Sequence, residues 1–230
     1  MTVTAETMKV ERQDEVTKIL NLNRPEFANA LNMTLVREIT DEVITSYSDA
    51  TKLLIVKGQG RHFCSGFDLE VAESERNLLG VAVEALLQLL ADAPFVTVAR
   101  VQGSAVGGGA DIAAACDYLC ADDTAKFSFP GFRLIGVSLG NSRLARRIGP
   151  DQAMRMVLEA RRVESAEALR MGLATDLCDD QKFGDFVAEM QGALATMPRE
   201  TLRMLKQSVR RSNGFALRTN SQGHEGITAP

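Results

Sequence analysis

Hydrophobic and polar residues alternate in short blocks over the N-terminal third of the chain. Met8–Val10 and Val16–Leu22 are brief apolar runs separated by a polar break, and they predict two strands. Beyond them, apolar residues recur every three or four positions, which predicts a helix that Asn29 caps and that runs to about Ser46. The chain is therefore expected to begin with the order strand, strand, helix.

The alternation of strand and helix continues through the middle of the chain. Strands are predicted where compact apolar runs occur, at residues 52–56, 95–101, 117–121 and 126–129. Helices are predicted at residues 69–91 and 107–115, and the first of these ends before Pro94. Such an alternation is typical of an α/β protein.

Beyond Gly131 the pattern is mostly helical. Helices are predicted at residues 143–148, at 152–160 with Asp151 as the N-cap, and at 166–171, 183–196 and 199–212, with one short strand at 174–177. Residues 213–230 are rich in Gly, Ser and Thr, and we expect a flexible tail there. Because no low-complexity linker divides the chain, we expect one α/β domain with a helical C-terminal region.

The composition is that of a globular protein with enough apolar residues for a sizeable core. Of 230 residues, 45% are hydrophobic and 24% are charged, and the net charge of −4 argues against a general nucleic-acid binder. Charged residues interrupt the long apolar stretches, and the first ten residues have no apolar segment, so we expect neither a membrane span nor a secretory signal. The four cysteines lack metal-pair spacing, which indicates reduced thiols in a cytoplasmic protein and no metal site.

Two glycine-containing segments, Phe63–Leu69 and Gly103–Asp111, carry the most specific signal for chemistry. Each follows a predicted strand and leads into a predicted helix. The first N–H groups of a helix have no acceptor within the helix, so each segment presents backbone donors. Two such donors that converge on one point can hold a carbonyl oxygen that becomes negative during a reaction. The segments therefore predict an oxyanion hole and acyl chemistry.

Four segments, taken in order, resemble the crotonase (enoyl-CoA hydratase/isomerase) superfamily. They are Asn23–Pro25 with Asn29–Leu31, Phe63–Leu69, Gly103–Asp111 with Cys116–Asp117, and Phe127–Pro130 with Gly149. The resemblance implies a spiral of repeated β-β-α units in a single domain at residues 1–212, with a core to about residue 160 and a helical region at 161–212. It also implies a homotrimer or a dimer of trimers.

The resemblance also implies a substrate and a site. Family members bind acyl-CoA thioesters and stabilise an enolate with two backbone N–H groups, which here correspond to those of Phe67 and Gly108. Asp111, one turn into the short helix, corresponds to a catalytic carboxylate and is expected to transfer the proton. Coenzyme A enters as part of the substrate, and no tightly bound cofactor is implied. The residues that correspond to the substrate-binding segments are Arg24, Phe27, Cys64, Ser65, Gly66, Asp68, Leu69, Gly107, Pro130 and Gly131.

The chain departs from the family pattern at Gly131. Family hydratases carry a second catalytic glutamate there, and this chain reads Pro130-Gly131. One carboxylate suffices for a proton shift that moves a double bond, so isomerisation, hydration and other enolate chemistry such as decarboxylation stay open. Arg133 could pair with a carboxylate on the acyl group of a substrate. Farther along, Lys206, Arg210 and Arg211 either reach phosphate groups of coenzyme A or form a solvated cationic face.

Three other functions compete with this interpretation. A thioester hydrolase would use Cys64, Ser65 or Ser104 as the nucleophile and His62 or His224 as the base. A non-catalytic acyl-CoA-binding subunit is favoured by the missing glutamate. A dinucleotide-binding site is disfavoured, because the glycines after Gly103 do not follow the spacing that such a site requires.

Overall fold

The computed structural model describes residues 7–70, 72–136 and 139–209. Six strands of this part of the chain form one sheet: β1 (Met8–Arg12), β2 (Thr17–Leu22), β3 (Leu53–Gly58), β4 (Val96–Val101), β6 (Tyr118–Ala121) and β9 (Asp176–Leu177). They lie in the order β1-β2-β3-β4-β6-β9. β1 is antiparallel to β2, and all other neighbours are parallel.

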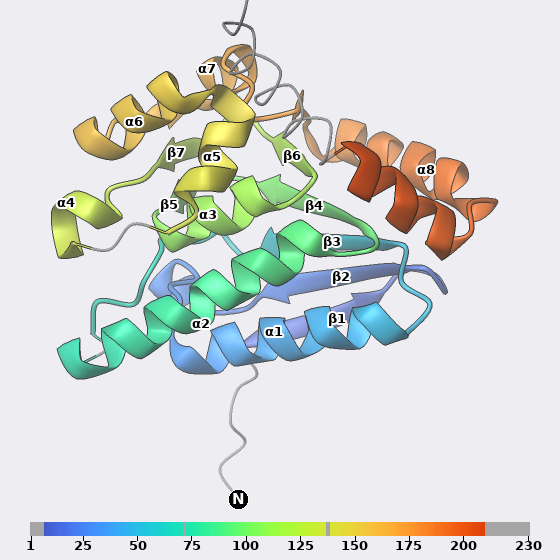
Figure 1. Cartoon of the computed structure of the whole chain (residues 1–230), viewed down its shortest axis with the longest axis horizontal. Helices are drawn as coiled ribbons and strands as arrows, with labels where there is room; N and C mark the ends of the chain where they lie inside the picture. Colours follow the sequence, from blue (N-terminus) through green and yellow to red (C-terminus); the bar gives the residue numbers. More distant parts are fainter. Residues whose placement is uncertain (1–6, 71, 137–138, 210–230) are drawn as a thin grey trace, which may run out of the picture.

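Helices cover both faces of this sheet (Figure 1). α1 (Met33–Ser48) and α2 (Glu73–Asp92) lie side by side on one face, and α8 (Asp180–Ala195) lies on the other. In β3, Leu54 and Val56 pack in the core with α1 and α2, whereas Leu53 and Ile55 pack with α8. Successive side chains of a strand point to opposite faces. A sheet buried on both faces therefore needs an apolar residue at every position, which explains the uninterrupted run in β3.

A second sheet lies beside the first and contains elements that the sequence pattern did not predict. It joins β5 (Ser104–Val106), β7 (Lys126–Ser128) and β8 (Val163–Glu164). β5 and β7 are parallel, and β7 and β8 are antiparallel. β5 and β8 have three and two residues, too few for a periodicity. The other helices are η1 (Pro25–Phe27), α3 (Gly108–Ala115), α4 (Gly131–Ile135), α5 (Asn141–Ile148), α6 (Pro150–Glu159), α7 (Ser165–Arg170) and residues 199–209.

The predicted cap of the first helix is wrong. Asn32 caps α1, because its side chain accepts a hydrogen bond from the Leu35 N–H at 2.9 Å. Asn29 instead has a positive φ of 55°, and its amide donates to the carbonyls of Gln59 at 3.0 Å and His62 at 2.8 Å. Its side chain thus joins two segments that are distant in the sequence.

Two other predicted helix starts are also wrong. α2 begins at Glu73 and not at Leu69, since the residues just before Leu69 are bonded to neighbouring segments. At α6, Gly149 occupies the N-cap position without a side-chain bond, and Asp151 lies inside the first turn. There its negative charge is favourable near the positive end of the helix dipole.

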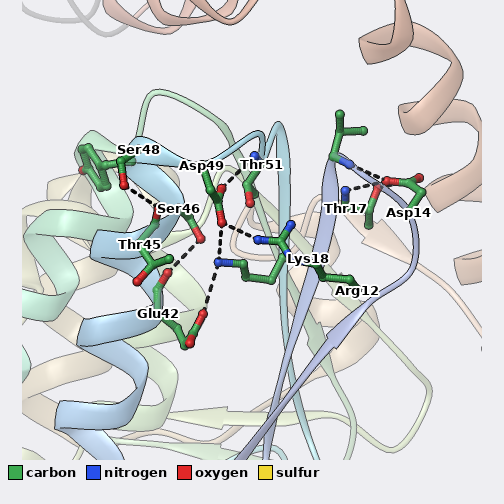
Figure 2. Close-up of polar contacts among 12 residues, drawn as sticks. Arg12, Asp14, Thr17, Lys18, Glu42, Thr45, Ser46, Ser48, Asp49 and Thr51 are labelled. Atoms are coloured by element: carbon green, nitrogen blue, oxygen red, sulfur yellow. Dashed lines mark hydrogen bonds and ion pairs between the residues drawn. The ribbon is translucent and has the colours of Figure 1, made fainter.

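Lys18 on β2 is buried, with only 1% of its side chain exposed, and two carboxylates compensate its charge (Figure 2). Its Nζ lies 2.9 Å from Asp49 Oδ2 and 3.1 Å from Glu42 Oε2. Arg12 also pairs with Asp49, and the Thr51 N–H donates to Asp49 Oδ1 at 2.8 Å. Burial alone would raise the pKa of Asp49, but hydrogen bonds from Thr51, Lys18 and Arg12 outweigh it and hold the pKa well below its ordinary value. This cluster ties β1 and β2 to the C-terminal end of α1.

Basic side chains attach the last described helix, residues 199–209, to the rest of the domain. Arg199 donates to backbone carbonyls in the last turn of α1, at 2.9 and 3.2 Å. Lys206 pairs with Asp117 at 2.6 Å, so it is a structural contact and not part of a solvated face. The predicted phosphate contacts Arg210 and Arg211 and the predicted tail at 213–230 lie outside the described residues.

Candidate active site

The first loop (residues 64–68) is held from one side by β5. The Cys64 N–H donates to the Ser104 carbonyl at 3.1 Å, and the Cys64 carbonyl accepts from the Val106 N–H at 3.0 Å. Cys64 thereby forms a parallel bridge with Ala105. The loop is thus fixed as if it were an additional strand.

The other side of the first loop is held by Leu31, and this fixes the direction of one backbone donor. The Leu31 N–H donates to the Gly66 carbonyl at 2.7 Å, and the Asp68 N–H donates to the Leu31 carbonyl at 2.9 Å. In a parallel bridge, the residue between those two bonds points its own N–H away from the partner. That residue is Phe67, and its N–H makes no hydrogen bond within the part of the chain that the structure describes.

A second backbone donor comes from the first residue of α3. Gly108 has no acceptor for its N–H inside the helix. A Cβ placed on Gly66 would lie 3.6 Å from the Gly108 nitrogen, and one placed on Gly108 would lie 3.2 Å from the ring of Phe67. A Cβ on Gly109 would lie 2.3 Å from the Cys64 carbonyl oxygen. The glycines therefore let α3 begin directly against the first loop.

Both donors border one cavity of about 100 Å³. The predicted site residues that line it are Ser65, Gly66, Phe67, Leu69, Gly107, Gly108, Asp111, Pro130 and Gly131. The rest of the described lining is Val106, Phe129, Phe132, Leu134, Ile135, Leu139 and Asn141. A mostly apolar wall with a few polar groups at one end is typical of a site for a small molecule that has an apolar portion.

Asp111 has the one titratable side chain in the described lining of this cavity. The residue is 5% exposed, and no hydrogen-bond partner for its Oδ1 occurs among the described residues. Burial raises the pKa of Asp111 well above its ordinary value, the negative charge of Glu84 raises it further, and Arg143 opposes the shift. A buried carboxyl with a raised pKa can hold or accept a proton near neutral pH, which is what general acid–base chemistry needs.

Three predicted substrate-binding residues lie together outside the cavity lining. Arg24 pairs with Asp68 at 3.0 Å, and its guanidinium carbon lies 4.6 Å from the centre of the Phe27 ring. The Ser65 hydroxyl donates to the Phe27 carbonyl at 3.4 Å, which joins this group to the first loop. These residues are therefore adjacent to the cavity without forming its wall.

Cys64 and His62 do not form the nucleophile and base that a hydrolase requires. Burial raises the pKa of the Cys64 thiol to about 12, so the reactive thiolate is scarce at neutral pH. His62 Nδ1 accepts a hydrogen bond from the Ser104 backbone N–H at 3.1 Å, which occupies that nitrogen. Burial, with the charges of Arg61 and Arg162, lowers the pKa of His62. The histidine supports the backbone, and this arrangement disfavours covalent catalysis by Cys64.

Apart from Val106 and Phe129, the lining residues that sequence reasoning missed come from the stretch after Gly131. Phe132, Leu134 and Ile135 belong to α4, a single short helix that ends at Gly136. Arg133 on the same helix is absent from the lining and donates to the Glu159 carbonyl at 3.3 Å. The signal that could have identified this wall is the run of apolar residues beside the family-like segment that ends at Pro130.

Within the described ranges, no group of three or more His, Cys, Asp or Glu residues is placed to hold a metal ion. Over the same ranges, no helix is long and apolar enough to cross a membrane.

Comparisons with known proteins identify the family and the fold. The family model for enoyl-CoA hydratase/isomerase matches residues 11–227. A Mycobacterium bovis protein named "Probable enoyl-CoA hydratase echA8" is 35% identical over 91% of this chain and 83% of its own length. The 2,3-dehydroadipyl-CoA hydratase of Escherichia coli is 28% identical over 96% of this chain and 93% of its own length. The crystal structure of enoyl-CoA hydratase from Bacillus anthracis has the same fold, with a TM-score of 0.83 and 24% identity over 94% of this chain and 87% of that one. The chain belongs to the enoyl-CoA hydratase/isomerase family and has the crotonase fold.

Proposed function

We propose that this chain forms an enolate from an acyl-CoA thioester, with the N–H groups of Phe67 and Gly108 as donors to the thioester oxygen and Asp111 as the proton-transfer group. The observation that carries the proposal is the position of the Asp111 carboxyl in the wall of the cavity that both donors border. Each backbone donor to a developing oxyanion typically contributes about 3 kcal/mol to stabilisation of the transition state. The dipole of α3, which begins at Gly108, adds positive potential at the same point.

The reaction that this site supports best is a shift of a double bond. Asp111 supplies the one carboxyl group of the described lining, and Gly131 supplies none. The Asp111 carboxylate removes a proton from the α-carbon, the thioester oxygen takes up the negative charge, and the carboxylic acid returns the proton to the γ-carbon. One group thus performs both transfers, and the substrate gains or loses no atom.

Hydration of an enoyl-CoA is the second candidate, because the relatives named above are hydratases. It would require a water molecule positioned by Asp111 together with another group. The two reactions differ in product mass, since hydration adds one water and isomerisation adds nothing.

Coenzyme A is the proposed carrier of the acyl group, and no other cofactor is needed for either reaction. The ring of Phe27, which is 45% exposed, offers an aromatic surface to a nucleotide, and Arg24, buried and paired with Asp68 of the first loop, supports it from below. The acyl chain would lie along Leu69 and the apolar residues of α4.

A homotrimer or a dimer of trimers is the proposed assembly. Leu78 and Val81 of α2 are 65% and 70% exposed in the single chain, and burial between subunits would remove them from water. Sedimentation equilibrium should give three or six times the 25.0 kDa mass of the chain. A mass of one chain at micromolar concentration would contradict this assembly.

The proposed activity can be tested with a panel of 2-enoyl-CoA and 3-enoyl-CoA thioesters, with mass spectrometry of the products. We expect wild type to interconvert double-bond positions without a change in mass, and Asp111→Asn to lose about 10²- to 10⁴-fold in rate. Asp151→Asn is the matched control, because Asp151 also lies in the first turn of a helix but is exposed. Turnover in Asp111→Asn equal to that of wild type would refute the role of Asp111, and products heavier by one water would select hydration.

A further inference from the structure

The Asp111 carboxyl lies against the backbone of Gly140, immediately before α5. A Cβ placed on Gly140 would lie 2.5 Å from Asp111 Oδ1 and 3.0 Å from its Cγ. Gly140 also has a φ of +66°, a conformation that residues with a side chain rarely adopt. Gly140 therefore forms a wall that touches the carboxyl and leaves no room for another side chain.

Glu84 of α2 contacts this wall directly, and Glu84 and Gln88 together hold Arg143 of α5. The Gly140 N–H faces Glu84 Oε2 at 3.4 Å. Arg143 Nη1 lies 2.8 Å from Glu84 Oε1, and Arg143 Nη2 donates to Gln88 Oε1 at 2.7 Å. Arg143 is 4% exposed, and its charge is compensated by Glu84, whose side chain is 45% exposed.

The same pair supplies the charges that face Asp111. The electrostatic contributions to its buried carboxyl come from Glu84 on α2 and Arg143 on α5, with opposite signs. α3 has no other titratable residue, and Arg133 of α4 is directed to the Glu159 carbonyl. Neither Glu84 nor Arg143 belongs to the described lining of the cavity, so both act on Asp111 without touching a substrate.

We propose that Glu84 and Arg143 are positioning residues for Asp111, fixing Gly140 against its carboxyl and balancing the charge around it. This inference rests on the proposed role of Asp111 as the proton-transfer group. Loss of either partner shifts the ionisation equilibrium of the Asp111 carboxyl in a known direction. Removal of the negative charge of Glu84 favours the ionised carboxyl, and removal of the positive charge of Arg143 favours the protonated one.

The test compares Glu84→Gln, Arg143→Gln and the double variant by the pH dependence of kcat and KM for the double-bond shift. In a reaction that needs the carboxylate, the acid limb should move to lower pH in Glu84→Gln and to higher pH in Arg143→Gln. On that limb each pH unit of displacement changes the rate about tenfold. We expect the KM to stay near the wild-type value, because neither residue lines the cavity. The double variant should return the limb toward its wild-type position, and Glu75→Gln, an exposed change on the same helix, should leave it unmoved.

A readout that needs no activity separates this inference from the proposed function. The raised pKa of Asp111 makes the free energy of unfolding fall as the pH rises from the ordinary pKa of an aspartate toward the folded one. Urea titrations at a series of pH values give the free energy of unfolding of each variant with Asp111 and with Asp111→Asn. The difference between the two shows the pH at which the decline caused by Asp111 ends. It should end at lower pH in Glu84→Gln. The amide keeps one of the two acceptor oxygens that Glu84 offers to Gly140 and Arg143, so this variant carries the test even if Arg143→Gln does not fold. An unmoved decline in Glu84→Gln overturns the positioning role, whereas full activity in Asp111→Asn overturns the proposed function alone.

Discussion

Replacement of Gly109 by alanine should separate the two backbone donors of the site. The added methyl would lie 2.3 Å from the Cys64 carbonyl oxygen, 2.7 Å from its Cβ and 2.8 Å from its Sγ. Ordinary contacts between non-bonded carbon atoms lie at about 3.5–4.0 Å. The Cys64 carbonyl is part of the backbone, and both the N–H and the carbonyl of Cys64 are hydrogen-bonded to β5, so Cys64 cannot give way. The start of α3 must therefore move away from the first loop by about 1 Å.

This movement has consequences for both stability and rate. Overpacking of a well-filled core costs about 1–3 kcal/mol, so the midpoint of urea unfolding should decrease. Because Gly108 moves with α3 while Phe67 stays with the first loop, the donors no longer converge on one oxygen. A misplacement of about 1 Å can lower the rate about 10²-fold, and we expect that loss in kcat.

Gly184→Ala in α8 is the matched control for this change. No atom lies within 4 Å of a Cβ placed there, and the residue is exposed within a helix. Removal of a glycine from a helix should raise the free energy of unfolding by about 0.5–1 kcal/mol and leave turnover unchanged. A Gly109→Ala variant as stable and as active as wild type would refute the close contact between α3 and the first loop.

Three further predictions concern charged groups. Asp49 has a lowered pKa, so its stabilising contribution is complete above about pH 4 and is lost as the pH falls below that value. In Asp49→Asn, the free energy of unfolding should therefore depend less on pH in this acid range, and an unchanged dependence would contradict the cluster. Lys18→Met leaves the carboxylates of Glu42 and Asp49 without their buried cation, and it should lower the free energy of unfolding in urea by about 2–4 kcal/mol. A decrease below about 0.5 kcal/mol, which is typical of a surface pair, would contradict this. Asp111→Asn should stabilise the protein at pH 8 by about 1.4 kcal/mol for each unit between the folded and the unfolded pKa of Asp111, and it should give no gain near pH 4. The same gain over wild type at both pH values would contradict the raised pKa.

The part of the fold that could be predicted from the sequence is the part with strong periodicity. α1 and the buried strand β3 have long apolar patterns because each packs a whole face against the core. β5 and β8 have none, since their two or three residues are ordered by pairing with β7. The misplaced cap at Asn29 has a similar cause, because its side chain bonds to carbonyls about 30 residues away, at Gln59 and His62.

The site shows the same division. The glycine segments around Phe67 and Gly108 could be identified from the residues alone, and the structure brings both to one cavity. Gly140 and the pair of Glu84 and Arg143 could not, because their relation to Asp111 depends on how α2, α3 and α5 pack. No periodic or motif-like pattern in the sequence connects these positions.

Exchange of the α-protons of a saturated acyl-CoA in D₂O, measured by mass spectrometry, tests enolate formation by this protein without any other reaction. A saturated thioester can neither add water nor shift a double bond, so deuterium at the α-carbon reports enolate formation alone. Enolate formation with Asp111 as the base predicts exchange in wild type and in Asp151→Asn, and a loss of about 10²-fold or more in Asp111→Asn. Exchange that continues at the wild-type rate in Asp111→Asn, or no exchange in wild type although the acyl-CoA binds, would contradict it.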